Sequence, residues 1–365
     1  MADVVIVGGG PAGCAAGLSL RSHAPGLSVV LIEGTGYDEP RIGETLSPLA
    51  GRLLRHLGIW DAFLAGNHSE VYGTAAAWGD STPHENEFLF NANGNGWHLD
   101  RAAFDALLAA EAERRGVHLL RRTRLIDSEE GWRLRLSNGD ELTARYVIDA
   151  TGSAAAFARR RGARFVASDR LTGFVRFFED REDRDPRTLV EAFAEGWWYT
   201  SGLPGGARIV ACLTDADLAR RMRLTDTTSW SSLLDSTESV KEALKGADPQ
   251  SPVLVRATPS RRLDPAVGEG WLAVGDAASL FDPLSSSGIL KGMRSGVFAS
   301  YAVGDLLAKG DDRGLRGYRR FLQEEFESYL RMRARYYSEE RRWPGSEFWQ
   351  RRASLGLSPE NLRAG

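Results

Sequence analysis

The chain opens with Ala2-Asp3-Val4-Val5-Ile6-Val7-Gly8-Gly9-Gly10-Pro11-Ala12-Gly13 and, after an alanine-rich segment, continues with Leu27-Ser28-Val29-Val30-Leu31-Ile32-Glu33. This order predicts a strand, a glycine turn, a helix, a second strand and an acid, the pattern of a dinucleotide-binding βαβ unit. Gly8 allows the tight turn, Gly10 lets a pyrophosphate approach the backbone, and Gly13 lets the helix pack closely on the strand. The helix start, at Pro11 and Ala12, offers free N–H groups to the pyrophosphate. Glu33 is placed to accept hydrogen bonds from a ribose.

Bulk properties predict a soluble protein with one large or two interleaved domains. The 365 residues are 42% hydrophobic, which suffices for a substantial core. The net charge of -3 and the sequence pI of about 6.1 argue against a nucleic-acid-binding protein. Cys14 and Cys212 lie far apart, so we expect no disulfide and a reducing compartment. The first strand leaves no room for a signal peptide, and no apolar run approaches the ~20 residues that cross a bilayer. We therefore expect a cytoplasmic protein without membrane contact.

Nucleotide-binding features recur at distant places, which predicts a discontinuous domain. One buried strand ends in Ala150-Thr151-Gly152, a second backbone approach to the cofactor, and another ends in Gly275-Asp276. The strand-rich residues between them show no such feature and are the natural substrate domain. We expect an α/β fold with a Rossmann domain, an inserted and mostly antiparallel β-sheet substrate domain, and a helical C-terminus. The expected boundaries are 1–75, 97–160 and 260–310 for the Rossmann domain, 161–259 plus 76–96 for the substrate domain, and 311–365 for the C-terminal segment.

The C-terminal region is predicted to be helical with one buried face. Large apolar residues recur there at intervals of three and four, namely Leu315, Tyr318, Leu322, Phe326 and Tyr329. We interpret the dense arginine and glutamate content of residues 311–352 as the solvated face of this helix. A partner-binding surface is the alternative.

A second motif, from Gly275-Asp276 to Pro283 and on to Ser287-Gly288-Ile289, indicates the kind of cofactor. An aspartate at the end of a buried strand can accept a hydrogen bond from a polyol hydroxyl. A glycine that opens the next helix aims free N–H groups at the ligand. If that ligand is a flavin ring, the helix end stabilises the negative charge that reduction places near N1 and O2.

The two motifs together resemble the glutathione-reductase-like FAD proteins of the aromatic hydroxylase type, over roughly residues 1–310. The resemblance implies that FAD is the cofactor. Arg41 and Arg101 match that family's cofactor-contacting arginines, and Glu44 and Thr45 in the Arg41 segment are expected to bind FAD as well. The chain has no second Gly-x-Gly-x-x-Gly motif and no redox cysteine pair. Electrons are therefore expected from NAD(P)H that docks transiently, or from a separate flavin reductase.

Two segments look similar to the flavin-dependent tryptophan halogenase superfamily, namely Arg41-Ile42-Gly43-Glu44-Thr45-Leu46-Ser47-Pro48 and Phe281-Asp282-Pro283-Leu284-Ser285-Ser286-Ser287-Gly288-Ile289. That family has a catalytic lysine soon after the first segment, whereas only four lysines occur here and the first is Lys241. An arginine cannot readily replace it, because the guanidinium stays protonated. The family's glutamate corresponds to Ser285, and its Gly-Trp-x-Trp-x-Ile-Pro motif is altered to Gly196-Trp197-Trp198-Tyr199-Thr200-Ser201-Gly202-Leu203-Pro204.

These departures resemble a non-halogenating subgroup of the superfamily, as does the tail from Arg341 to Trp349. The subgroup includes flavoprotein maturases that help build tryptophylquinone cofactors in bacterial oxidases. The resemblance implies an FAD-dependent monooxygenase, in which reduced FAD and O2 give a C4a-hydroperoxide that attacks an electron-rich aromatic carbon. The substrate would be a small molecule or a tryptophan in a precursor protein. A halogenase, a prenyl-type double-bond reductase or dehydrogenase, and a non-catalytic maturation factor are the alternatives.

Five residues are candidates for the chemistry. Trp197, Trp198 and Tyr199 are predicted to line an aromatic cavity between the flavin and the substrate domain, with packing in a sheet core as the alternative. Glu44 and Asp282 are the carboxylates expected near the ring, as acid/base or hydrogen-bonding groups. For Asp282, capping of a turn is the alternative. We find no histidine placed as a general base and no metal-ligand spacing.

Overall fold

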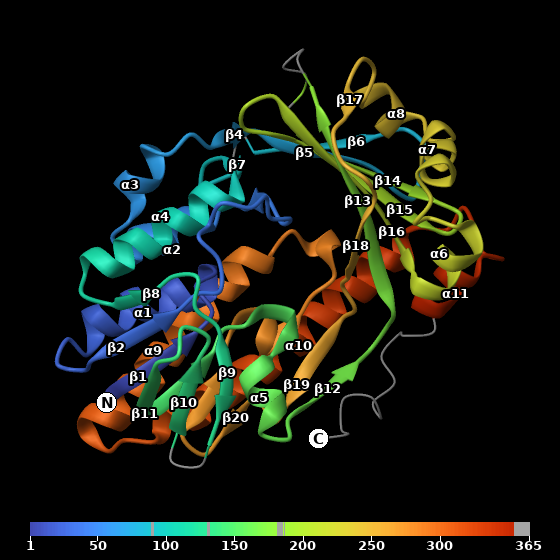
Figure 1. Cartoon of the computed structure of the whole chain (residues 1–365). Helices are drawn as coiled ribbons and strands as arrows, with labels where there is room; N and C mark the ends of the chain where they lie inside the picture. Colours follow the sequence, from blue (N-terminus) through green and yellow to red (C-terminus); the bar gives the residue numbers. More distant parts are fainter. Residues whose placement is uncertain (89–90, 130–131, 181–184, 186, 354–365) are drawn as a thin grey trace.

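Two eight-stranded sheets organise the chain, which the computed structural model describes over residues 1–88, 91–129, 132–180, 185 and 187–353. Figure 1 shows the first sheet at the lower left and the second at the upper right. The first sheet has the order β20-β21-β11-β1-β2-β8, extended through β10 and β9 beside β11, and β21, β11, β1, β2 and β8 are parallel. Its strands are β1 (Ala2–Val7), β2 (Val29–Ile32), β8 (His118–Leu120), β9 (Leu125–Ser128), β10 (Arg133–Leu136), β11 (Glu141–Asp149), β20 (Val267–Gly268) and β21 (Trp271–Ala273).

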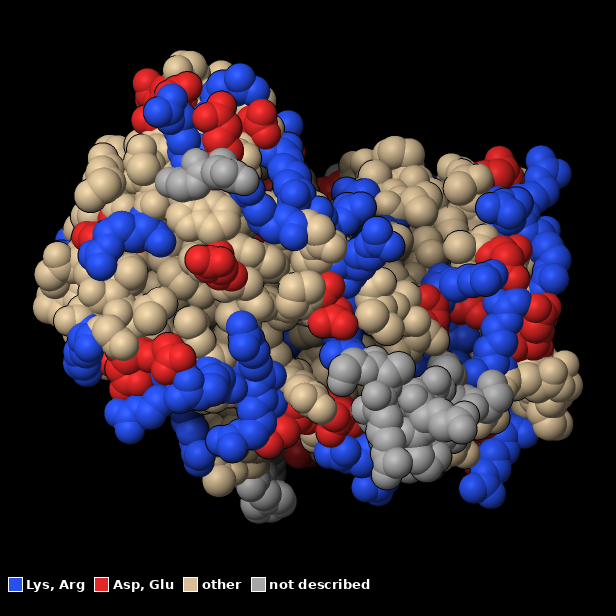
Figure 2. Space-filling view, turned by 90° about the horizontal axis from the view of Figure 1, so that it is seen from below, with Lys and Arg blue, Asp and Glu red and all other residues tan. Residues whose placement is uncertain are grey.

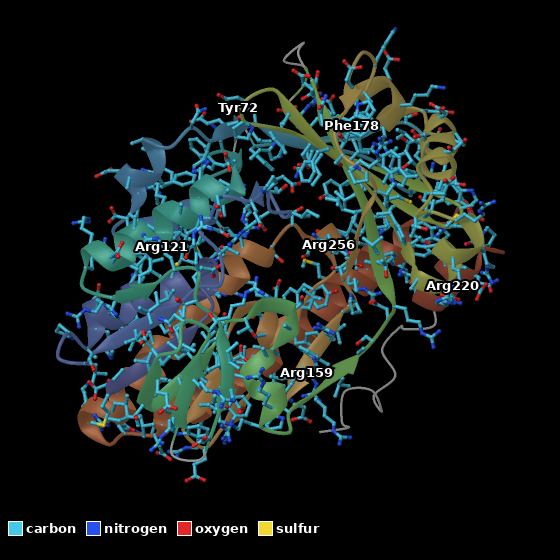
Figure 3. The ribbon with its side chains drawn as sticks, viewed as in Figure 1. Tyr72, Arg121, Arg159, Phe178, Arg220 and Arg256 are labelled. Atoms are coloured by element: carbon cyan, nitrogen blue, oxygen red, sulfur yellow. The ribbon has the colours of Figure 1, made fainter. Side chains whose placement is uncertain are left out.

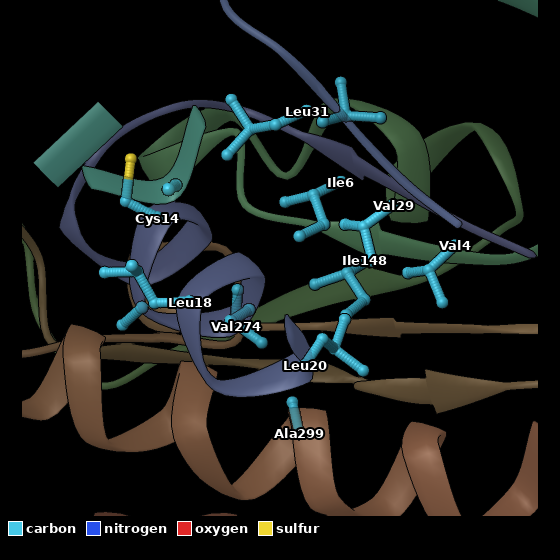
Figure 4. Close-up of a cluster of buried hydrophobic side chains, with 14 of the residues drawn as sticks. Val4, Ile6, Cys14, Leu18, Leu20, Val29, Leu31, Ile148, Val274 and Ala299 are labelled. Atoms are coloured by element: carbon cyan, nitrogen blue, oxygen red, sulfur yellow. The ribbon is translucent and has the colours of Figure 1, made fainter. Parts of the chain in front are cut away.

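The main core lies where helix α1 (Pro11–His23) packs between this sheet and helix α9 (Gly288–Lys309). Figure 4 shows Val4 and Ile6 of β1 facing the two helices, with Ala299 of α9 below them. All three side chains are fully buried. The β-branched run of β1 is therefore covered by helices, as expected for a central strand of a parallel sheet.

Two glycines let these backbones approach more closely than side chains would permit. A Cβ atom on Gly13 would lie 2.0 Å from the carbonyl oxygen of Gly8, and one on Gly296 would lie 2.3 Å from the carbonyl oxygen of Ala12. Gly8 itself has a φ of +114°, the left-handed region that glycine adopts without strain. The structure thus contains the glycine turn and the close helix packing that the sequence predicts.

The second sheet has the order β17-β13-β16-β15-β14-β5-β6, with β18 beside β13, and its described pairs are antiparallel except β14 with β5. Its strands are β5 (Gly73–Ala77), β6 (His84–Glu87), β13 (Leu171–Glu179), β14 (Thr188–Phe193), β15 (Gly196–Leu203), β16 (Ala207–Asp215), β17 (Asp248–Pro249) and β18 (Leu254–Ala257). Helices α7 (Thr227–Asp235) and α8 (Ser239–Ala243) cover one face, and side chains of the C-terminal helices pack on the other.

Helix α10 (Arg313–Glu339) runs from the first sheet to the second. Near its start, the Tyr318 hydroxyl donates a hydrogen bond to the Ala273 carbonyl of β21 (2.8 Å). Near its end, the Tyr337 hydroxyl accepts a hydrogen bond from Trp197 Nε1 of β15 (3.0 Å). Tyr318, Leu322, Phe326 and Tyr329 are buried and Leu315 is partly buried, which confirms the predicted helix face.

The remaining elements are two small sheets and short helices. The sheets contain β3 (Thr45–Leu46), β4 (Ser69–Val71) and β7 (Gly96–His98), and β12 (Arg164–Ala167), β19 (Arg261–Asp264) and β22 (Ser279–Leu280). The helices are α2 (Ala50–His56), α3 (Trp60–Leu64), α4 (Arg101–Arg114), α5 (Ala156–Arg160), α6 (Ala216–Met222) and α11 (Glu347–Ala353), with 3-10 turns η2 (Gly152–Ala154), η3 (Gly275–Ala277) and η4 (Pro283–Ser285).

The predicted α/β class, with a parallel Rossmann sheet, an antiparallel second sheet and C-terminal helices, is confirmed. The second sheet already includes β5 from Gly73, slightly earlier than the expected boundary. Of the predicted C-terminal segment, residues 354–365 lie outside the described residues. Among the described helices, none is both long and apolar enough to cross a membrane.

Replacing Gly296 by alanine should destabilise the protein by about 1–3 kcal/mol, because the new methyl group would collide with the Ala12 carbonyl oxygen and push α1 and α9 apart. Gly317→Ala on α10 is the matched control, since no heavy atom lies within 4 Å of its Cβ position. Removing that helical glycine should stabilise by about 0.5–1 kcal/mol. Urea unfolding measures both effects, and equal stability of the two variants would contradict the close packing.

Candidate cofactor and active site

Four parallel strands of the first sheet end at one edge, and the predicted cofactor motifs follow them directly. Gly8 follows β1, Glu33 follows β2, Ala150-Thr151-Gly152 follows β11, and Gly275-Asp276 lies just beyond β21. The turns touch one another: a Cβ on Gly8 would lie 2.2 Å from the Ala150 carbonyl oxygen, and one on Gly275 would lie 2.8 Å from the Ala12 Cβ. In open α/β sheets this edge is where ligands bind.

Two helix starts at this edge have room and donors for a bound group. Gly10, before α1, and Gly288, at the start of α9, have no heavy atom within 4 Å of the position of a Cβ. Neither helix has a side-chain cap or an acidic residue in its first turn. Because the first N–H groups of a helix lack internal partners, these ends suit phosphate oxygens and the polar edge of a ring. The residues present therefore fit FAD, with its pyrophosphate at Pro11-Ala12 and its flavin at Ser287-Gly288-Ile289.

Glu33 is held in place by hydrogen bonds and can still accept a hydrogen bond from a ribose. Its Oε1 accepts from Thr35 N (3.0 Å), Thr35 Oγ1 (2.5 Å) and Arg41 Nη2 (3.2 Å), and its Oε2 accepts from Gly9 N (2.8 Å). A carboxylate oxygen has two lone pairs, so Oε2 can accept one more hydrogen bond. Tyr37, which the sequence analysis did not identify, fixes the same turn by donating to the Gly9 carbonyl (2.9 Å).

Arg41 and Arg101, predicted to contact the cofactor, meet at the fully buried carboxylate of Asp105. Arg41 Nη1 lies 2.7 Å from it, and Arg101 Nε and Nη2 each lie 3.2 Å from it. Arg101 Nη1 also donates to the carbonyl oxygens of Ile42 (2.9 Å) and Gly43 (2.7 Å). The arginines therefore fix the backbone of residues 41–44, here called the strap. Asp105 was missed, although its i,i+4 spacing from Arg101 was visible in the sequence.

Glu44, in the strap, meets Tyr199 of the second sheet. Glu44 is 3% exposed, and burial raises the pKa of its carboxyl, opposed by the N–H groups of Gly43 and Glu44 and by the Arg101 and Tyr199 side chains. Burial and the neighbouring Glu44 charge raise the pKa of the Tyr199 phenol well above its usual value. A buried carboxyl and a phenol that interact with each other thus lie where the strap meets the second sheet. Thr45 pairs with His98 in the small sheet beside it.

Trp197 and Tyr199 lie on the face of β15 that belongs to the cluster containing Ile42 of the strap and Leu284 of η4. This cluster connects the predicted cofactor loops to the second sheet. Trp197 is 1% exposed and hydrogen-bonded to Tyr337, so its side chain is packed inside this cluster. Tyr199 is the one of the three aromatic candidates that is not fully buried.

Trp198 lies on the opposite face, so the prediction that it lines the same cavity is wrong. Side chains alternate along a strand, and consecutive residues cannot share a face. Trp198 is fully buried against Trp230 of α7, with ring centroids 5.0 Å apart. Phe178, labelled on β13 in Figure 3, belongs to the same cluster. The alternative of sheet-core packing therefore applies to Trp198.

Asp282 is 1% exposed, and both of its carboxylate oxygens bind the protein itself. Oδ1 accepts from Leu284 N (2.9 Å) and caps η4, while Oδ2 accepts from the Tyr337 hydroxyl (2.7 Å) and lies 3.4 Å from Arg333 Nε. Burial raises the pKa of this carboxyl and the Arg333 charge opposes the rise. This geometry supports the capping interpretation of Asp282. It also fixes Pro283 at the start of the loop that leads to Ser287.

Arg333 was missed because the sequence analysis assigned the arginines of 311–352 to a solvated face. Figure 2 shows arginine and lysine side chains spread over the surface, but the Arg333 side chain is only 5% exposed. Its Nη2 lies 2.8 Å from Asp169, so the guanidinium bridges two buried carboxylates. The usable signal was spacing, since Arg333 and Tyr337 continue the buried face at four-residue steps after Tyr329.

Arg333→Met should destabilise the protein by about 3–5 kcal/mol, because Asp169 and Asp282 would remain buried without their counterion. Arg320→Met is the matched control on the exposed face of α10, where Arg320 lies 3.8 Å from Glu324. Its stability should stay within about 1 kcal/mol of the wild type. Urea unfolding measures the free energy of unfolding of both variants. Equal destabilisation by Arg333→Met and Arg320→Met would show that the buried ion pairs of Arg333 do not stabilise the protein more than an exposed pair does.

Glu44→Gln should change the dependence of stability on pH. Because burial raises the Glu44 pKa in the folded state, folding favours the protonated form, and the wild type loses stability as the pH rises through that pKa. The stability of Glu44→Gln relative to the wild type should therefore increase as the pH rises above the ordinary carboxyl pKa of 4.5. Glu39→Gln, at an exposed glutamate nearby in the sequence, is the matched control. Urea unfolding at each pH measures the stability of both proteins. A stability difference between Glu44→Gln and the wild type that stays constant with pH would contradict the prediction.

Comparisons with known proteins identify the family. The family described as FAD binding domain matches residues 1–320. LodB of Marinomonas mediterranea, assigned as an FAD-dependent oxidoreductase, is 32% identical over 360 residues and the alignment covers 96% of each chain.

Two solved structures have the same fold. The myxobacterial chondrochloren halogenase CndH superimposes with a TM-score of 0.89 at 24% identity, covering 99% of this chain and 87% of that one. The peptidyl tryptophan dihydroxylase QhpG superimposes with a TM-score of 0.71 at 24% identity, covering 96% and 78%. At such identities the likeness shows the fold alone. The chain therefore belongs to the FAD binding domain family and is an FAD-dependent oxidoreductase with the fold of the flavin-dependent halogenases.

Proposed function

We propose that this oxidoreductase is an FAD-dependent monooxygenase that hydroxylates an electron-rich aromatic group, with a tryptophan side chain of a partner protein as the favoured substrate. The family and the similarity to LodB support flavin redox chemistry. QhpG, described as a peptidyl tryptophan dihydroxylase essential for tryptophylquinone cofactor biogenesis, shares the fold. Electrons would come from NAD(P)H or from a separate flavin reductase.

The positions of the four lysines carry the choice of hydroxylation over halogenation. The halogenases that the sequence resembles use a lysine near the substrate. Here Lys291 is buried in the flavin domain, with its Nζ 2.8 Å from Asp276. The other three are exposed: Lys241, Lys245 and Lys309. Lys241 and Lys245 flank Val240 and Leu244, which pack with Trp198 on the other face of the second sheet, and Lys309 is the last residue of α9.

The protein's own residues would orient the aromatic group, exclude water and handle a proton. Bound FAD supplies the reduced ring that activates O2. Trp197, Ile42 and Leu284 form an apolar wall that keeps water away. Glu44, with its raised pKa, can hold a proton above the usual carboxyl range and exchange it with an aromatic N–H or O–H through Tyr199.

The test is turnover of the FAD-loaded protein with labelled O2 and a tryptophan-containing peptide, with chloride and bromide present. We expect one labelled oxygen atom in the indole by mass spectrometry. Tyr199→Phe should retain FAD but lower product formation about 100-fold, because proton transfer at the site is lost. Trp198→Phe, a substitution on the opposite face of β15, should keep most of the coupled turnover.

Incorporation of halogen would exclude the proposal. So would release of all reducing equivalents as hydrogen peroxide with every peptide and small indole or phenol tried. Equal product from Tyr199→Phe and the wild type would remove Tyr199 from the proton path while leaving hydroxylation in place.

A further inference from the structure

Lys291 is a buried cation at a place where helix electrostatics disfavour one. It is the fourth residue of α9, and its side chain is 2% exposed. The start of a helix carries partial positive charge, so a cation is better tolerated at the other end. Lysine is also among the residues least often buried unless it is paired. A specific partner must therefore offset the cost of placing Lys291 there.

That partner is the segment that carries the flavin motif. Lys291 Nζ lies 2.8 Å from Asp276 Oδ1 and also donates to the carbonyl oxygen of Ser279. It lies 4.7 Å from the centroid of the Phe281 ring, a cation–π distance. One ammonium thus connects three residues between the end of β21 and the loop before α9.

Asp276 faces the cofactor edge. Its side chain is 41% exposed, whereas the Lys291 side chain behind it is covered. Oδ1 is taken by Lys291, so Oδ2 can accept a hydrogen bond from a polyol hydroxyl. The Asp276 charge also acts on Arg261, whose guanidinium donates to the Ser153 carbonyl. Lys291 is therefore the direct counterion of a carboxylate placed beside the uncapped start of α9.

We propose that Lys291 is a positioning residue for the flavin. It neutralises Asp276 and directs the free carboxylate oxygen toward the ribityl chain. It also removes the repulsion that an unpaired carboxylate would exert on the negative charge that a bound flavin gains on reduction. The inference rests on FAD binding and does not depend on hydroxylation.

The experiment measures the FAD dissociation constant and the reduction potential of the bound flavin in five variants. Lys291→Met should weaken FAD binding about tenfold, because Asp276 loses its anchor, and should lower the potential, because an unpaired carboxylate disfavours reduction. Asp276→Asn should raise the potential, because Lys291 is left unneutralised. The double variant should return the potential close to that of the wild type, since the two charges are removed together.

Lys309→Met is the matched control, an exposed lysine at the other end of α9 that pairs with Asp305. It should change neither quantity. Lys291→Arg should keep the potential near that of the wild type, because the charge is retained. If Lys291→Met does not fold, the raised potential of Asp276→Asn and the retained potential of Lys291→Arg still test the proposal.

A purely structural role would appear as a lower melting temperature of Lys291→Met with an unchanged potential of its bound flavin, and that result would overturn the proposal. Shifts of the same sign in Lys291→Met and Asp276→Asn would overturn it as well. Because no aromatic substrate is present, these outcomes leave the proposed hydroxylation untouched. Conversely, if the protein does not hydroxylate an aromatic substrate, the reduction potentials expected for the Lys291 and Asp276 variants stay the same.

Discussion

The structure depends on backbone contacts that are too close to leave room for a side chain. The turn after β1, the start of α1 and the middle of α9 touch through Gly8, Gly13 and Gly296, each of whose missing Cβ would lie 2.0–2.3 Å from a carbonyl oxygen. This contact sets the distance between the parallel sheet and both helices. It therefore also sets where the two helix starts lie relative to each other. Gly10 and Gly288, which open those helices, have empty space at the Cβ position, so the tight packing and the room for a cofactor occur within the same few residues.

Besides the apolar cluster around Trp197, buried polar contacts tie the second sheet to this framework. Tyr337 of α10 bonds both Trp197 and Asp282, and Arg333 bridges Asp282 and Asp169. Burying such charges is costly, and an apolar contact of equal volume would often stabilise as much. What the polar contacts add is direction, because each hydrogen bond admits a narrow range of angles. They fix the position of the loop after Asp282 relative to the strand that carries Tyr199. An apolar contact would let the loop slide along that strand.

Much of the fold follows from the order of motifs along the chain, whereas the site depends on partners that local patterns do not reveal. The glycine turn, the strand ends and the buried face of α10 all have short-range signatures, and these predictions are confirmed. Trp198 was misplaced although the period of two along a strand excludes it from the face of Trp197 and Tyr199. Arg333 and Asp105 escaped notice for a different reason. A charged residue is assigned to the surface unless its counterion is known, and two of the counterions, Asp169 for Arg333 and Arg41 for Asp105, lie far away in the sequence.

The carboxylates around the cofactor edge are paired with basic side chains, with one exception. Glu33 pairs with Arg41, Asp276 with Lys291, and Asp282 with Arg333. These pairings offset the carboxylate charges and leave the partial positive charge of the helix starts available to an anionic cofactor. Glu44 differs, because among the described residues it forms no ion pair within 4 Å and its neighbour is the neutral phenol of Tyr199. Under the proposed function, this buried carboxyl without an ion-pair partner is the group at this edge that would exchange a proton, and it lies where the strap meets the aromatic face of the second sheet.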